Sequence, residues 1–209
     1  MNRPDTEATD VAMMRRCLAL SKTSGDLGEY PYAAIICRNG EFVCESINRV
    51  TRDRDVTRHA EVVALSEAQK ALRQTSLDDC TIYVNAEPCA YCSYAIRETR
   101  IGRVVYALKS PVMGGRSRWN ILADRRLSDT MPEVFALPPE IVAGYMEKEA
   151  EEVFATWNPL IWQFIKSRGL FVAHPAKEKI QGAHARRNGI GERIVNAFRR
   201  IVIDRIGRT

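Results

Sequence analysis

Two short motifs constrain the fold of this chain more than any other feature. The first is His59-Ala60-Glu61, and 26 residues separate it from the second, Pro88-Cys89-Ala90-Tyr91-Cys92. One imidazole and two thiolates give a zinc ion three protein ligands and leave its fourth tetrahedral position open for water. A closed structural site would need a fourth ligand, which the rest of the sequence does not offer at suitable spacing. We therefore expect a fold that brings these two motifs together.

Each motif alone has ordinary explanations. A lone histidine is more often a core or surface residue than a ligand, and a Cys-x-x-Cys pair can be a redox pair or half of a zinc knuckle. The joint arrangement favours a hydrolytic zinc site, because each motif opens a predicted helix and a predicted strand separates them. Glu61, two residues after His59, is then placed to move protons for the water at the open position.

Local sequence patterns place the first motif at a helix start. Thr57 is a fair N-cap for a helix over residues 58–73, in which apolar residues recur at helical spacing. His59 and Glu61 are therefore expected in its first turn.

The second motif follows a predicted strand. A β-branched and aromatic run over residues 80–84 predicts a buried strand. Pro88 suits the first turn of a helix over residues 89–99, since proline loses no helical hydrogen bond there. The positive end of that helix dipole lowers the cost of ionising Cys89 and Cys92.

The other predicted elements alternate between helix and strand, which favours a sheet covered on both faces. Asn39-Gly40 is typical of a tight hairpin turn. The remaining helices are expected over residues 9–23, 140–157 and 159–167, the remaining strands over residues 32–38, 41–47, 103–108 and 133–137, and a long loop over residues 109–131.

With these motifs the chain resembles the cytidine deaminase superfamily, and more closely the branch with bacterial tRNA adenosine deaminase, guanine deaminase and fungal-type cytosine deaminase. H-x-E followed by P-C-x-x-C is typical of zinc-dependent nucleobase deaminases. The resemblance implies an α/β fold, a three-layer α/β/α sandwich around a five-stranded mixed sheet. It covers about residues 8–165 and is carried by residues 29–36, 48–49, 55–61, 82–92 and 100–106.

The resemblance also implies a Zn²⁺ cofactor held by His59, Cys89 and Cys92. Glu61 would be the catalytic proton carrier of a hydrolytic deamination, in which water replaces an amino group on a ring carbon and ammonia leaves. A non-enzymatic zinc protein is disfavoured, because a structural site would not require Glu61.

Three residues are candidate substrate contacts. The family carries an asparagine that hydrogen-bonds the substrate at the end of the second strand, where this chain has Asn48. A plain turn residue would also fit that position. Tyr32 and Tyr91 could offer a stacking face to a flat ring, or could simply pack in the core.

The substrate class stays open between two alternatives. A small-molecule heterocyclic amine such as a nucleobase or nucleoside is favoured, because residues 157–162 are apolar and interrupted by Pro159 where tRNA-acting relatives carry aromatic and basic residues. Residues 32–34 and the residues around Cys92 depart from the usual pattern as well. The alternative is a tRNA-specific adenosine deaminase, converting adenosine to inosine, or another nucleic-acid deaminase.

The length of 209 residues suits one deaminase domain over residues 1–170 and a basic tail over residues 171–209. Residues 173–209 carry a net charge of +6, while the whole chain carries +5. The tail holds a possible amphipathic helix that could bind nucleic acid, an anionic membrane surface or a partner subunit, or could be a solvated charged face.

Four cysteines outside the motifs (Cys17, Cys37, Cys44 and Cys80) fall in predicted helices or strands, where thiols pack more often than they form disulfides. The sequence predicts neither a signal peptide nor a transmembrane segment. We expect a cytoplasmic protein, and the resemblance implies a homodimer.

Overall fold

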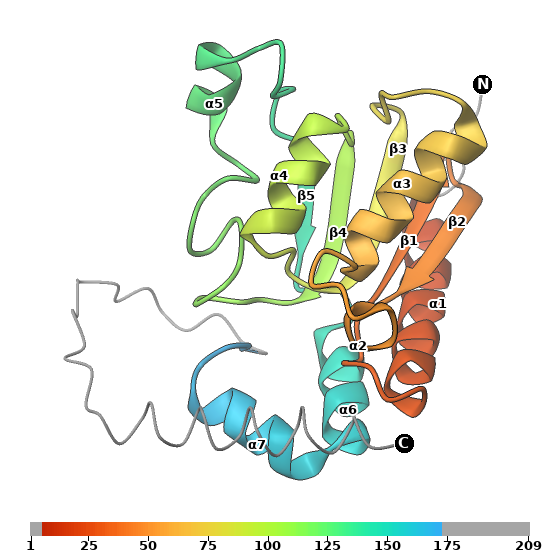
Figure 1. Cartoon of the computed structure of the whole chain (residues 1–209), viewed down its shortest axis with the longest axis vertical. Coiled ribbons are helices and arrows are strands. Elements are labelled where there is room, and N and C mark those ends of the chain that lie inside the picture. The colour runs from red at the N-terminus through yellow and green to blue at the C-terminus, as the bar shows by residue number, and fades with distance from the viewer. Residues whose placement is uncertain (1–5, 173–209) are drawn as a thin grey trace, which may run out of the picture. The chain divides into compact units, whose positions relative to one another are not determined.

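Five strands form one mixed sheet in the part of the chain that the computed structural model describes, residues 6–172 (Figure 1). The strands are β1 (Ala33–Arg38), β2 (Glu41–Ile47), β3 (Cys80–Ala86), β4 (Arg103–Leu108) and β5 (Glu140–Ala143). The helices are α1 (Thr6–Asp26), α2 (Val50–Asp53), α3 (Ala60–Leu72), α4 (Ala90–Glu98), α5 (Arg125–Thr130), α6 (Glu147–Trp157) and α7 (Pro159–Ser167).

The strand order across the sheet is β2-β1-β3-β4-β5. Strand β1 runs antiparallel to both β2 and β3, whereas β3, β4 and β5 run parallel to one another. The predicted hairpin between β1 and β2 is confirmed. Its turn residues Asn39 and Gly40 have φ values of 51° and 86°, the left-handed conformations that a tight two-residue hairpin turn requires.

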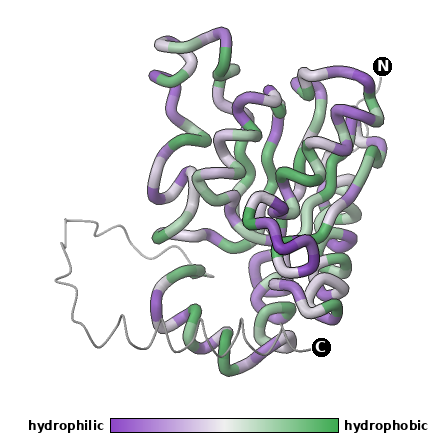
Figure 2. The backbone as a smooth tube through the Cα atoms, in the orientation of Figure 1, coloured by the Kyte–Doolittle hydropathy of each residue, from purple (hydrophilic) through white to green (hydrophobic). Residues whose placement is uncertain are grey.

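Helices cover both faces of the sheet, which confirms the predicted three layers. Helices α1 and α6 pack on one face, while α3 and α4 pack on the other (Figure 1). Strand β1 is buried on both sides: Ile35 and Cys37 join the core beneath α1, and Ala34 and Ile36 join the core beneath α3. Figure 2 shows hydrophobic residues along the strands and polar residues around α2.

Both motif helices begin one or two residues later than the sequence predicts. Thr57 is not an N-cap, because its hydroxyl donates to Asp55 Oδ1 at 2.6 Å, and His59 is the N-cap of α3. Pro88 lies before the first turn of α4, whose N-cap is Cys89. The consequence is that two of the three predicted ligands stand at the junctions between loop and helix.

The predicted position of the fifth strand, residues 133–137, is wrong. Residues 133–137 form a turn instead, in which the carbonyl of Ala136 accepts a hydrogen bond from the buried Arg97 at 2.6 Å. The actual strand, β5, occupies the start of the predicted helix over residues 140–157, so that α6 begins only at Glu147. Strand β5 pairs with β4 from Arg103 to Tyr106, and Arg103 Nε lies 3.2 Å from Glu140 Oε1.

Most other predicted elements are confirmed. The strands over residues 41–47 and 103–108 and the helix over residues 159–167 have the predicted bounds. The first helix and the strand that begins at Cys80 are longer than predicted, while α2 and α5 are additional, the latter inside the predicted long loop.

The predicted tail helix lies outside the described residues, and the division at residue 170 stays a prediction. None of the helices within residues 6–172 is both long enough and apolar enough to cross a membrane.

Candidate metal centre

The predicted metal ligands lie where two helices begin. Helices α3 and α4 lie on the same face of the sheet and start at the same end of it (Figure 1). Their N-caps are His59 and Cys89, and Cys92 is in the first turn of α4. Neither N-cap side chain makes the usual capping hydrogen bond, and both are directed at the other predicted ligands instead. The positive ends of two helix dipoles meet here, which favours thiolates.

The three donor atoms form a compact triangle. His59 Nδ1 lies 3.7 Å from Cys89 Sγ and 3.3 Å from Cys92 Sγ, and the two sulfurs are 3.6 Å apart. Tetrahedral zinc with ordinary bond lengths requires about 3.6 Å between nitrogen and sulfur and about 3.8 Å between sulfurs. The donor set therefore fits zinc. No fourth His, Cys, Asp or Glu within residues 6–172 joins this group, so one coordination position is left open.

The electrostatics of the triangle favour an anionic sulfur. The hydrogen bonds with Cys92 and with His59 together outweigh the effect of burial and lower the pKa of Cys89 to about 4. The bond to Cys89 in turn raises the pKa of His59. Cys89 is therefore a thiolate at neutral pH, the form in which cysteine binds metals.

Glu61 lies beside the triangle without belonging to it. It is half-buried in the first turn of α3, two residues from His59. Burial raises the pKa of Glu61, and the negative charge of Cys89 raises it further. A bound dication would act in the opposite direction. Glu61 is thus a carboxyl group beside the predicted metal position, with a raised pKa.

The candidate substrate residue Asn48 is buried at the end of β2, with 4% of its surface exposed. Its side-chain Nδ2 donates to Glu29 Oε2 at 2.9 Å. The next residue, Arg49, donates its backbone N–H to the carbonyl of Arg58 at 3.0 Å. Because Arg58 immediately precedes His59, this bond ties the segment of Asn48 to the segment that leads into the metal centre.

The two candidate tyrosines differ in their surroundings. Tyr91 is 44% exposed, and its ring stands edge-to-face with the His59 ring at a centroid distance of 5.6 Å. Tyr32 packs against Phe154 and Phe171 in the core, at 5.6 and 6.3 Å. Burial raises the pKa of Tyr32, and Glu61 is near enough to add to this shift. Tyr91 borders the metal centre, whereas Tyr32 connects it to the core.

Sequence reasoning missed two buried glutamates near the site, Glu29 and Glu87. Glu87 is 4% exposed and accepts hydrogen bonds of 2.6–3.1 Å from the backbone N–H groups of Ser110, Arg116 and Ser117 and from the Ser117 hydroxyl. It thereby holds the loop over residues 110–117 against the segment before Cys89. The only feature of the sequence that could have pointed to Glu87 is its position directly after a buried strand. Its hydrogen-bond partners lie more than 20 residues further along the chain, so no local pattern reveals them.

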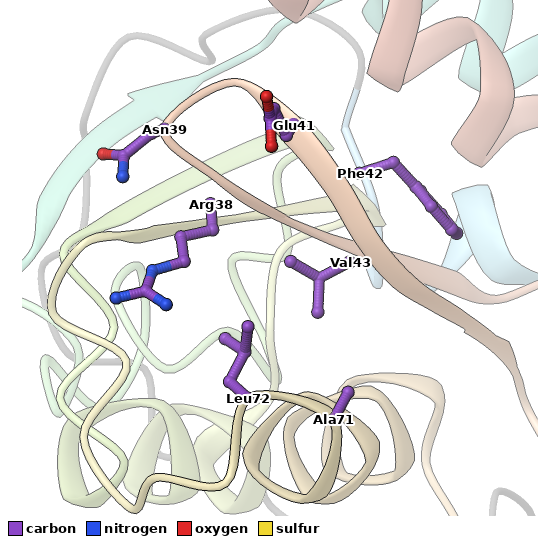
Figure 3. Close-up of a pocket in the computed structure, with 7 residues that line it drawn as sticks. All are labelled: Arg38, Asn39, Glu41, Phe42, Val43, Ala71 and Leu72. Carbon is purple, nitrogen blue, oxygen red and sulfur yellow. The ribbon is translucent and has the colours of Figure 1, made fainter.

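A separate groove lies at the other end of α3. It has a volume of about 620 Å³, and Figure 3 shows the side chains that line it. Because α3 rises about 1.5 Å per residue, the groove at Leu72 lies on the order of 20 Å from His59. It takes no part in the chemistry of the metal centre. Its lining residues are Arg38, Asn39, Glu41, Phe42, Val43, Ala71 and Leu72.

Comparisons with known proteins agree with this site. Residues 7–108 match the family model of the cytidine and deoxycytidylate deaminase zinc-binding region. The chain is 31% identical over 137 residues to the tRNA-specific adenosine deaminase of Aquifex aeolicus, covering 58% of this chain and 91% of that one. It is 30% identical over 160 residues to the "Probable cytosine deaminase" of Schizosaccharomyces pombe, covering 72% and 93%.

Longer relatives and solved structures match as well. The chain is 33% identical over 115 residues to the chloroplastic tRNA(adenine(34)) deaminase of Arabidopsis thaliana, which covers 55% of this chain but only 9% of that protein. A structure solved in studies of A-to-I editing by tRNA:A34 deaminases at the wobble position of transfer RNA is 28% identical. It superposes with a TM-score of 0.62 and covers 68% of this chain and 99% of the other.

Proposed function

This chain belongs to the cytidine and deoxycytidylate deaminase family, and on that premise we propose that it is a zinc-dependent hydrolytic deaminase of a nucleobase, nucleoside or similar small heterocyclic amine. The observation that carries the proposal is the open triangle of His59, Cys89 and Cys92 with a carboxyl group beside it. A structural zinc site would use four ligands and would have no need of Glu61.

The residues divide the reaction between them. His59, Cys89 and Cys92 would hold zinc, which when bound supplies the Lewis acidity that makes water a nucleophile at neutral pH. Glu61 accepts a proton from the attacking water and passes it to the ring nitrogen beside the attacked carbon. It then delivers the second proton to the departing amino group, so that one water is consumed and one ammonia is released. Asn48 and Tyr91 bind and orient the ring.

The aromatic residues of the last two helices support a small substrate. Trp162 is 3% exposed and stacks on Phe154 at 5.2 Å, and Trp157 packs on Tyr30 at 5.5 Å. Trp162 and Phe154 are buried in the core. They are therefore not free to stack on the bases of an RNA loop, which is how aromatic residues usually bind single-stranded RNA.

A tRNA-acting deaminase is the second candidate, since two of the relatives above carry that name. Basic residues near the metal centre favour it. Arg49, Arg52 and Arg58 all converge on Asp53 within 3.3 Å, in the segment just before His59. Guanidinium groups in excess over carboxylates are typical of surfaces that contact phosphates.

Ammonia release decides between the two candidates. Zinc-loaded protein would be assayed on cytosine, adenine, guanine, their nucleosides and bulk tRNA. The proposal predicts release from one free base or nucleoside, with little change when salt is raised. Release only from tRNA, falling steeply with salt, would instead establish the second candidate. No release from any substrate would contradict both.

We further propose that the enzyme is a homodimer in a reducing, cytoplasmic setting. All six cysteines are free thiols, which is typical of proteins in reducing compartments. Light scattering coupled to size exclusion measures the assembly. A mass of about twice the 23.6 kDa of one chain is expected, and a mass of 23.6 kDa would contradict the dimer.

A further inference from the structure

A buried carboxylate holds the side chain of Asn48. Glu29 is 2% exposed, and its Oε2 accepts from Asn48 Nδ2 at 2.9 Å. The same carboxylate accepts from the backbone N–H of Thr51 at 3.1 Å and from that of Arg52 at 2.6 Å. Glu29 therefore ties the side chain of Asn48 to the turn that follows it.

This contact fixes which way the amide of Asn48 is turned. Glu29 accepts this hydrogen bond through a carboxyl oxygen, so the amide nitrogen of Asn48, its only side-chain donor, faces Glu29. The amide oxygen Oδ1 is then directed away from Glu29. The backbone is fixed as well, since the N–H of Asn48 donates to the carbonyl of Tyr32 at 2.9 Å.

The amide oxygen of Asn48 is available to a ligand. Among residues 6–172 no donor bonds to Oδ1, and Oδ1 is not one of the fully buried polar atoms that lack a partner. Asn48 as a whole is 4% exposed, so this acceptor belongs to a largely buried residue. An oriented acceptor in an otherwise buried residue recognises a hydrogen-bond donor with high selectivity.

The segment from Asn48 to His59 is held at both ends. At its start, Glu29 accepts from Asn48, Thr51 and Arg52. Near its end, the carbonyl of Arg58 accepts from Arg49. Glu29 thus provides three of the contacts that fix Asn48 and the turn after it relative to the predicted metal centre.

We propose that Glu29 is a positioning residue for substrate recognition. It holds Asn48 so that Oδ1 accepts a hydrogen bond from the substrate, which selects heterocycles that carry a ring N–H, an amino group or a sugar hydroxyl at that place. The inference rests on the proposed function, because it takes Asn48 as a substrate contact.

The first test needs no substrate. The side-chain amide signals of Asn48 would be assigned in a ¹⁵N-labelled protein by their loss in Asn48→Ala. Glu29→Gln is expected to shift these signals and to speed the exchange of their hydrogens with solvent. Glu67→Gln, an exposed position on α3 paired with Lys70, is the matched control and should leave them unchanged. Unchanged signals in Glu29→Gln would overturn the proposal.

The second test exchanges the carboxylate of Glu29 and the amide of Asn48 between the two positions. Asn48→Asp places two buried carboxylates against each other, and KM for whichever of cytosine, guanine and adenosine is deaminated is expected to rise about tenfold or more. Adding Glu29→Gln lets residue 29 donate to the new carboxylate, which still offers an acceptor to the substrate, and only the hydrogen bond from the Thr51 N–H to the same atom is lost. KM is then expected to return to within a few-fold of the wild-type value.

The outcomes separate the two proposals. A double variant that regains the thermal stability of the wild type but keeps the KM of Asn48→Asp would overturn the role of Glu29 in recognition. An equal rise of KM on Glu29→Gln in the wild type and in Asn48→Ala would overturn it too, since Glu29 would then act without Asn48. Absence of deamination by the wild-type protein would refute the proposed function. The amide signals of Asn48 would still show whether Glu29 holds its side chain.

Discussion

Two of the three proposed ligand residues, His59 and Cys89, are N-caps without a capping hydrogen bond. An N-cap side chain usually accepts a hydrogen bond from the first turn of its helix, and neither His59 nor Cys89 does so. Their side chains face each other across the two helix starts, with Nδ1 and Sγ 3.7 Å apart. The capping interaction that each helix forgoes is offset when a metal ion joins the two residues.

Zinc content tests the proposed set of three ligands directly. Cys92→Ser is expected to reduce the zinc content from about one ion per chain to less than about a tenth after dialysis against a weak chelator. The reason is that a zinc site loses most of its affinity for the metal when one of its thiolate ligands is removed. Elemental analysis measures the ratio. Cys80→Ser, at a buried thiol in β3, is the matched control and should keep its zinc. Full zinc occupancy in Cys92→Ser would contradict the ligand assignment.

Buried thiols outside the site are expected to make the folded protein less stable at alkaline pH. Burial raises the pKa of Cys37 and Cys80 to about 12, from the usual 9.0. Unfolding exposes thiols that ionise near pH 9, so stability is fully present below that pH and is lost as pH rises towards 12. Each thiol lowers the free energy of unfolding by at most about 1.4 kcal/mol per pH unit in this window.

Denaturant unfolding between pH 8 and pH 11 measures this dependence. The wild-type free energy of unfolding is expected to fall above pH 9, and Cys80→Ala should fall less steeply because one thiol is gone. Identical slopes for the two proteins would show that Cys80 does not contribute.

At the scale of single elements, local chemistry predicted the hairpin but not the last strand. Asn39-Gly40 specifies its turn through backbone conformations that few other residues adopt. Residues 133–137 have the apolar character of a strand, yet Phe135 packs on Tyr94 and Ala136 bonds to Arg97. Which short apolar run pairs with β4 is decided by such tertiary contacts, and strand propensity cannot show them.

The hairpin turn offers a test of this local specification. Gly40→Ala is expected to lower the free energy of unfolding by about 1 kcal/mol, because φ at this position is 86° and a Cβ disfavours it. Chemical denaturation measures the change. Asn39→Gly tolerates the left-handed conformation and should leave stability almost unchanged. A larger loss for Asn39→Gly than for Gly40→Ala would contradict the turn geometry.

The loop over residues 110–117 depends on one side chain. Glu87→Gln leaves one oxygen in place of two, so the four hydrogen bonds to that carboxylate cannot all be kept. Hydrogen exchange of the amides of Ser110, Arg116 and Ser117 is expected to rise about tenfold or more, the factor for a lost bond of about 1.4 kcal/mol. Glu133→Gln, at an exposed position, is the control. Unchanged protection in Glu87→Gln would show that the loop is held by other contacts.

At the scale of the whole molecule, the sequence predicted the sheet, its helical layers and the metal-binding motifs, since these depend on periodicity and spacing. It could not show that Glu29 orients Asn48, because 19 residues separate them and only the folded chain brings them together. The substrate class is undetermined by the sequence for the same reason. The residues proposed to contact the ring, Asn48 and Tyr91, come from separate segments, the end of β2 and the start of α4.

The catalytic domain should act without the basic tail. The described residues 6–172 already form two hydrophobic cores and bring the three proposed metal ligands together. Deletion of residues 173–209 is therefore expected to change the rate of ammonia release from a small substrate by no more than about twofold, as for a change remote from the site. A rate that falls with the deletion on small substrates would show that the tail contributes to catalysis.

Glu61 is proposed to move protons at an open zinc site, and one set of variants separates this role from metal binding. Ammonia release and zinc content would be measured together in the wild type, in Glu61→Gln and in the control Glu67→Gln on the same helix. Because Glu61 is not a ligand, Glu61→Gln should keep its zinc, and its rate should fall by about 10²- to 10⁴-fold. The control should match the wild type. Wild-type rates in zinc-loaded Glu61→Gln would contradict the account.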